Sequence, residues 1–172
     1  MRRTVFSAIG ATLLFVSLAS AEMKLGYINS EAIFAEYEGT KEAQNKFNKE
    51  VAVWEQEASK KQQEIKNLKD QIEKQSLLLS SERKKVLEDS LNQKMVDYQK
   101  FLQDKFGQKG EALVKNEELT KPIIEKINRI IENIAKEENY DYIFDARAGG
   151  IVYAKKVYDL NQRVLEALNK EK

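Results

Sequence analysis

The sequence predicts an α+β protein in which a long antiparallel helical hairpin, a coiled-coil arm, projects from a small β-sheet body. Three observations support this fold class. An apolar 3-4 repeat runs unbroken from Gln44 to Leu79, a second helical pattern follows it, and short β-rich runs lie near both ends of the chain. The sequence contains a single proline, which suits long continuous helices.

The first helical pattern has one narrow apolar seam. Eight of its eleven seam positions are apolar, and charged or amide side chains fill most of the positions between them. Such a seam has to be covered by another helix, and the arm that it predicts, at 40–80, is on the order of 60 Å long. The seam positions are Gln44, Phe47, Val51, Trp54, Ala58, Lys61, Ile65, Leu68, Ile72, Gln75 and Leu79.

The same chain supplies the covering helix after a turn at Ser80-Ser81. Ser81 is a good N-cap, and the negative charge of Glu82 favours a helix start. Antiparallel pairing about this turn places Trp54 near Gly107, which leaves two explanations for this glycine and for Gly110. Either they make space for the indole, or they mark a fray point in the descending helix. The expected seam of that helix is Leu87, Leu91, Met95, Tyr98, Leu102, Phe106 and Leu113.

The body is predicted from segments at both ends of the chain. Residues 24–29 form a short strand, Asn29 or Ser30 caps a brief helix, and Gly39-Thr40 provides a break before the long helix. A third helical run carries a stripe of isoleucines, and Pro122 inside it predicts a kink or a helix start.

Two β-rich runs follow, at 140–144 and 151–153, and they predict a hairpin of two strands across Gly149-Gly150. Asp159 is then expected to cap a final short helix. We therefore divide the chain into a signal peptide at 1–21, a body formed by 22–39 and 119–172, and the hairpin arm at 40–118.

A sheet this small predicts oligomerisation through the body. Its strand edges would be exposed, and the isoleucine stripe is wider than a two-helix seam requires. The residues expected to make the contacts between subunits are Leu25, Tyr27, Ile28, Ile143, Phe144, Ile151, Val152 and Tyr153.

The N-terminus predicts export. Arg2-Arg3, an apolar run at 5–18 and Ala19-Ser20-Ala21 form the three regions of a secretory signal peptide, with cleavage expected after Ala21. A retained membrane anchor is the alternative, but the apolar run is short for a span of about 20 residues. We therefore expect the mature protein in the periplasm.

Composition argues against an enzyme. The chain contains no Cys and no His, which excludes thiol nucleophiles, imidazole bases and ordinary zinc sites, and we expect no cofactor. Removing Arg2 and Arg3 lowers the basic residues from 29 to 27 against 28 acidic residues, so the mature chain carries a net charge near −1. Nucleic-acid binding requires an excess of Lys and Arg to neutralise phosphates, and a chain with this net charge lacks that excess.

One local excess of positive charge lies at the turn of the arm. Lys74, Arg83, Lys84 and Lys85 surround the single acidic residue Glu82. A weak contact of this tip with anionic lipid headgroups or with acidic segments of a partner is one interpretation, and an ordinary solvated loop is the other.

Four short segments carry a resemblance to a known family. They are Lys-Leu-Gly-Tyr-Ile-Asn-Ser at 24–30, Tyr-Asp-Tyr-Ile-Phe-Asp at 140–145, Gly-Ile-Val-Tyr-Ala at 150–154 and Asp-Leu-Asn-Gln-Arg-Val-Leu at 159–165. Together with the signal peptide and the hairpin between them, they resemble the Skp/OmpH family of periplasmic chaperones over essentially the whole mature chain.

The resemblance implies a homotrimer whose strands form a central intersubunit β-barrel, with three arms around a cavity. It also implies an ATP-independent holdase that keeps unfolded outer-membrane proteins, its clients, from aggregating in that cavity. The best-known members are strongly basic and this mature chain is nearly neutral, so long-range electrostatic steering of clients is not expected.

Holding an unfolded chain requires a weakly apolar surface away from the seam. The alternative interpretation of exposed apolar residues on the arm is that they pack against a neighbouring arm near the body. A rival function is a structural or adaptor coiled-coil protein of the cell envelope, but the arm surface lacks the aromatic or Arg anchor that a specific interface would usually show. The candidate client-binding residues are Val53, Leu77, Leu78, Val86, Val96 and Phe101.

Overall fold

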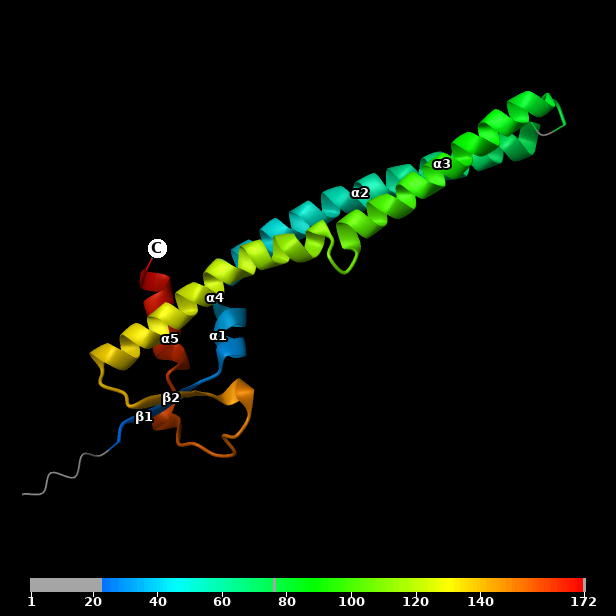
Figure 1. The fold of residues 1–172 in the computed structure, drawn as a ribbon. Helices are drawn as coiled ribbons and strands as arrows, with labels where there is room; N and C mark the ends of the chain where they lie inside the picture. Colours follow the sequence, from blue (N-terminus) through cyan, green and yellow to red (C-terminus); the bar gives the residue numbers. More distant parts are fainter. Residues whose placement is uncertain (1–22, 76, 172) are drawn as a thin grey trace, which may run out of the picture.

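The computed structural model describes residues 23–75 and 77–171, so the predicted signal peptide at 1–21 lies outside the described residues. A helical arm projects from a small body that contains both strands (Figure 1). The elements, in chain order, are β1 (Leu25–Ile28), α1 (Ser30–Glu36), α2 (Glu38–Gln75), α3 (Ser81–Phe106), α4 (Glu111–Glu137), β2 (Tyr142–Asp145), the 3-10 turns η1 (Ala146–Ala148) and η2 (Lys156–Tyr158), and α5 (Asn161–Lys170).

The ascending helix of the arm has the predicted seam. Helix α2 contains 38 residues, which corresponds to roughly 57 Å. Every predicted seam side chain from Phe47 to Ile72 is buried or partly buried, whereas Gln44 and Gln75 at the two ends are exposed. The apolar period in the sequence therefore located this helix face correctly.

The descending helix follows the predicted seam in part, because Leu87 is buried and Leu91, Tyr98 and Leu102 are partly buried. Met95 and Phe106 are exposed, and Lys94 and Lys105 are partly buried against α2 instead. The Nζ of Lys94 lies 2.8 Å from the Glu64 carboxylate. Lysine can take such a position because its aliphatic stem covers apolar surface while its amine reaches a charged or aromatic partner. Leu113, the last expected seam residue, is also exposed and belongs to α4.

The turn of the arm begins earlier than predicted. Helix α2 ends at Gln75, and Ser80 is the N-cap of α3, because its Oγ accepts a hydrogen bond from the Arg83 N–H at 3.3 Å. Leu79 is partly buried and occupies the last seam position, as expected.

A break at Gly107–Gly110 divides the descending side of the arm. Helix α3 ends at Phe106, and α4 begins after Gly110. A Cβ on Gly110 would lie 2.7 Å from the Lys105 carbonyl oxygen, so the close approach of the backbone requires glycine there. A Cβ on Gly107 would meet Gln103 first, not Trp54. The glycines therefore serve the helix break and not the indole.

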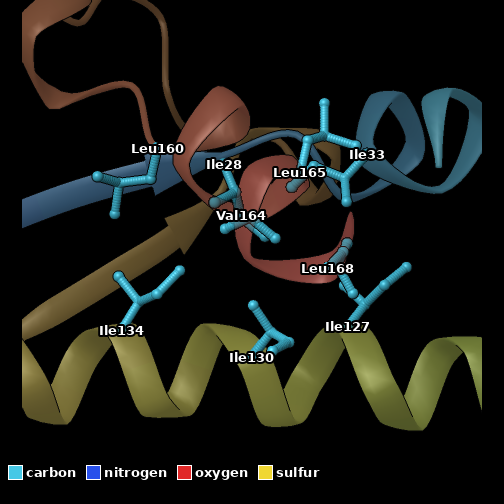
Figure 2. Packing of buried hydrophobic residues seen from close by; sticks show 9 residues of the cluster. All are labelled: Ile28, Ile33, Ile127, Ile130, Ile134, Leu160, Val164, Leu165 and Leu168. Carbon is cyan, nitrogen blue, oxygen red and sulfur yellow. The ribbon is translucent and has the colours of Figure 1, made fainter. Parts of the chain in front are cut away.

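Helix α4 joins the arm to the body. It begins at Glu111, so Pro122 lies inside the helix and does not start it. The helix crosses the predicted boundary at 118/119, which makes it continuous between the two parts (Figure 1). In the body its residues Ile127, Ile130 and Ile134 are buried and face α5 (Figure 2). The chain itself therefore covers these isoleucines, which the sequence analysis took as a sign of oligomerisation.

The predicted hairpin of two C-terminal strands is wrong. Strand β2 pairs with β1 in parallel, with Leu25 opposite Tyr142 and Ile28 opposite Asp145. Residues 151–153 form no strand, because the chain turns away after β2 through η1 and two glycines in left-handed conformations, Gly149 at φ 82° and Gly150 at φ 91°. The arm itself is the long crossover that a parallel pair requires.

The second edge of β1 is also covered. Tyr27 forms an isolated bridge with Asp159, and its carbonyl accepts from the Leu160 N–H at 2.9 Å. Asp159 also accepts from the Asn161 N–H at 2.9 Å, and the N-cap residue of α5 is Leu160, one position later than predicted. This segment therefore ties the start of α5 to the sheet.

One residue separates the body from the arm. Tyr37 lies between α1 and α2, so the break comes before the predicted Gly39-Thr40, and both of these residues are helical. The Nζ of Lys126 donates to the Tyr37 hydroxyl at 3.0 Å and to the Leu168 carbonyl at 3.4 Å. Helices α4 and α5 thereby hold this junction.

One apolar cluster forms the core of the body. It lies between α4, α5, α1 and β1, and its side chains converge on α5 (Figure 2). Ile33, Val164 and Leu168 are fully buried, which explains why so short a helix as α1 is stable in this position. The cluster consists of Ile28, Ile33, Ile127, Ile130, Ile134, Leu160, Val164, Leu165 and Leu168.

Asn161→Ala is expected to destabilise the body. The Asn161 Oδ1 accepts from the partly buried Asn29 N–H at 2.7 Å, at the corner between β1 and α1. Removing the acceptor leaves this N–H unpaired, which costs about 1–3 kcal/mol. Urea unfolding at fixed protein concentration measures the change. Asn161→Asp retains an acceptor oxygen and is the control; an equal loss in both variants would contradict this role of the Asn29 hydrogen bond.

Candidate binding surfaces

The body carries an exposed apolar surface beside the sheet. Strand residues and residues of the irregular segment 149–158 contribute to it, and a cavity of about 400 Å³ lies between them. We call this surface the body face. Its exposed residues are Met23, Leu25, Tyr142, Phe144, Val152, Tyr153, Val157 and Tyr158.

The sheet next to this face has an open edge. Strand β1 is paired with β2 on one side and bridged to Asp159 on the other. Within the described part of the chain, β2 has β1 as its only strand neighbour. Its outer edge therefore leaves backbone donors and acceptors available for pairing.

The structure divides the predicted oligomerisation residues into three groups. Ile28 is buried in the core of the chain itself, and Ile143 packs against that core. Tyr27 and Ile151 are partly buried, whereas Leu25, Phe144, Val152 and Tyr153 are exposed. Val152 is 100% exposed, so nothing in the single chain covers it.

Sequence reasoning missed Tyr142 as a surface residue. Its ring stacks on Phe144 with centroids 6.0 Å apart and an interplanar angle of 17°. The signal was present, because residues two apart on a strand lie on the same face. Met23, Val157 and Tyr158 had no such periodic signal, since they lie outside the strands.

Hydrogen bonds hold the end of β2 in place and lower the pKa of Asp145, its last residue. Desolvation raises the pKa of Asp145, but hydrogen bonds from Ser30 and from the Arg147 N–H outweigh it, so this pKa lies below its ordinary value. Partial burial, followed by the negative charge of Asp159, raises the pKa of Tyr27. These contacts orient β2 and β1 next to the body face.

The predicted client-binding residues lie along the arm. Val53 on α2 and Val86 and Val96 on α3 are exposed. Leu77 and Leu78 are exposed at the far end of the arm. Phe101 is partly buried in the seam, where the Lys61 ammonium lies 5.3 Å from its ring centroid. Five of the six residues are therefore at the surface.

The described residues contain no cluster of acidic or metal-ligating side chains that would hold a metal ion. In the same part of the chain, no helix is both long and apolar enough to cross a membrane.

Comparison with known proteins identifies the family. Residues 24–168 match the model of the family described as outer membrane protein (OmpH-like), and the chain belongs to this family. Its mostly helical fold with long arm helices and a small sheet is similar to a crystal structure from Caulobacter crescentus CB15 that is described as an outer membrane chaperone (OmpH-like). The TM-score is 0.79 at 14% sequence identity, over 88% of this chain and 87% of the other. No curated protein matches the chain.

Proposed function

We propose that this protein is a periplasmic chaperone that binds unfolded outer-membrane proteins without ATP, in a cavity between the arms of a homotrimer. The observation that carries the proposal is the long arm on a body whose apolar face and strand edge are uncovered in the single chain. Membership of the OmpH-like family supports the same function.

Trimer formation follows from the incomplete sheet. A two-stranded sheet is marginally stable on its own, and large apolar side chains such as Val152 and Tyr153 are unfavourable in water. In the proposed trimer, residues 151–153 of one subunit approach the open edge of β2 in the next. Three copies then close an intersubunit barrel, which leaves no strand edge exposed.

The arm surface suits weak binding of many sequences. Val53, Val86 and Val96 are exposed valines dispersed along the arm, and Met95 beside Val96 is also exposed. Each can bury a small apolar area against a client without fixing its conformation. Isolation between the arms then keeps the client from other unfolded chains, which is what prevents aggregation.

We expect the protein to suppress aggregation of a urea-denatured outer-membrane β-barrel protein at stoichiometric amounts and without ATP. Light scattering after dilution of the denaturant measures this effect. A denatured soluble globular protein is the comparison client and should be protected less. Equal protection of both clients would contradict the proposed client class, and no protection would contradict the chaperone function.

Val53→Ser with Val86→Ser is expected to weaken this protection. The two substitutions remove exposed apolar area, so the amount of chaperone needed for half protection should rise roughly twofold or more. Gln62→Ser with Gln99→Ser is the matched control, because both glutamines are exposed on the arm. An equal effect in the two double variants would show that the valines have no particular role.

A further inference from the structure

Three lysines occupy seam positions of the arm, where apolar residues are usual. The seam of α2 includes Lys61, and that of α3 includes Lys94 and Lys105. Their side chains are 34%, 42% and 20% exposed, so all three lie partly inside the arm. A lysine at a seam position lowers stability relative to an apolar residue, so these positions require another explanation. In strict spacings of three and four, the α3 seam is Leu87, Leu91, Lys94, Tyr98, Phe101 and Lys105.

Each seam lysine has a partner on the opposite helix. The Nζ of Lys61 lies 5.3 Å from the centroid of the Phe101 ring. The Nζ of Lys105 lies 5.4 Å from the centroid of the Trp54 ring. The third lysine, Lys94, forms its ion pair with a glutamate of α2. These cation–π and charge contacts connect α2 with α3 at one relative position of the two helices.

Apolar matching alone does not determine the register, which is the alignment of α2 with α3 along the arm. The seam repeats every heptad, so sliding one helix past the other by one heptad, about 10 Å, brings seam positions opposite seam positions again. Such a slip moves the turn along the chain by roughly half a heptad. The short turn therefore restricts the register to the observed one and its two neighbours, and another feature has to select among them.

The seam lysines distinguish the observed register from both neighbours. Lys61 contacts Phe101, and Tyr98 is the preceding position of the α3 seam. Lys94 lies one heptad before Phe101, so a slip in one direction brings Lys94 against Lys61. Lys105 lies one heptad after Tyr98, so a slip in the other direction brings Lys105 against Lys61. Either slip therefore places two ammonium groups together in a partly buried seam, where they repel each other.

Carboxylates close to these lysines along the chain do not alter this difference. Glu57 lies 3.5 Å from the Nζ of Lys61 on the same helix, so the two residues move together when α2 slides. Glu111 pairs with Lys105 and follows it on the descending side of the arm. Both ion pairs are therefore retained in every register. The contacts that change are those between α2 and α3, and they favour the observed register.

We propose that Lys61, Lys94 and Lys105 fix the register of the arm: they contact rings and a carboxylate in the observed alignment and would meet one another in its two neighbours. Polar residues at single seam positions specify register in coiled coils at a cost in stability. The register decides which side chains share the arm surface and where the break between α3 and α4 lies along α2. This inference does not depend on the proposed chaperone function.

The test measures the register in the protein starting at Glu22. Gln56→Cys on α2 and Ser90→Cys on α3 provide exposed sites for two spin labels, because the chain has no cysteine of its own. Labelled protein is diluted with unlabelled protein, so that pulsed electron paramagnetic resonance measures the distance within one chain. The parent should give a single distance. The labels lie at different heights along the arm, so a slip by one heptad would change this distance by about 10 Å.

Two substitutions of Lys61 should change the register. Lys61→Leu removes the lysine that takes part in both repulsive contacts, so a second distance should appear, about 10 Å from that of the parent. Its melting temperature should equal or exceed that of the parent, because leucine suits a seam position. Lys61→Glu replaces repulsion by attraction in both slipped registers, so the second distance should be populated roughly twofold more than in Lys61→Leu.

Two controls separate register from other effects. Lys61→Arg retains the cation in the seam, and Lys60→Leu removes an exposed lysine beside it, so both should keep the single distance of the parent. A single unchanged distance in either Lys61→Leu or Lys61→Glu would overturn the inference. So would a second distance in a control variant. Loss of helicity in Lys61→Leu, measured by circular dichroism, would show that the lysine serves stability and not register.

Discussion

A protein carrying Phe144→Asp and Val152→Asp is expected to sediment as a monomer at concentrations where the parent protein is an oligomer. Both side chains are exposed in the single chain, so neither substitution removes core packing. In an assembled body the same positions would be enclosed, and an unpaired carboxylate in an apolar contact is costly to desolvate. Three subunits would bring six such charges together.

Arm helicity distinguishes dissociation from unfolding. The helices of the arm have their own seam, so the circular dichroism of the variant should remain close to that of the parent. Val53→Asp with Val96→Asp adds the same charge on the exposed arm and should leave the mass unchanged. A parent that is itself a monomer, or a body variant with the mass of the parent, would remove the basis for a cavity between arms.

Local patterns explain which parts of the fold the sequence predicts. The seam from Phe47 to Ile72 is a repeat within one helix, so its period alone identifies the buried face. The sequence also places Trp54 opposite the end of the descending helix, and its ring lies 6.2 Å from that of Phe106. Antiparallel helices joined by a short turn have little freedom to pair otherwise.

The choice of strand partner was not predictable in the same way. The run Tyr142–Asp145 and the run at 151–153 are both β-rich and close in sequence, which favours a hairpin. The observed partner of β2 is β1, more than a hundred residues away, and the arm between them brings the two together. Short strands carry no information on such distant pairing, and only the core around α5 selects it.

The same limit applies to the candidate surfaces. A period of two shows which residues of a strand share a face, but the packing of the body decides which face is covered. Ile28 and Ile143 therefore face the core, whereas Phe144 stays exposed. The exposure of Leu77 and Leu78 was easier to predict, because both residues depart from a strict seam period and the helix ends beside them.

The second large effect is a loss of arm stability when Trp54 is replaced. Trp54 is only 7% exposed, although a two-helix arm provides little depth for burial. Its ring packs edge to face against Phe106, and the Lys105 ammonium lies 5.4 Å from its centroid. Phe106 and Lys105 are the last two residues of α3, so the indole packs next to the break between α3 and α4.

Trp54→Ala is therefore expected to destabilise the arm by about 3 kcal/mol or more, through lost apolar burial and an unfilled space in the seam. Hydrogen exchange of backbone amides should become faster in α2 and α3 and remain unchanged in β1, β2 and α5, because the core of the body contains no residue of the arm seam. Trp54→Phe retains a ring against Phe106 and should cost less than half as much. Equal losses in the two variants would show that ring packing contributes little, and faster exchange in the body would show that arm and body unfold together.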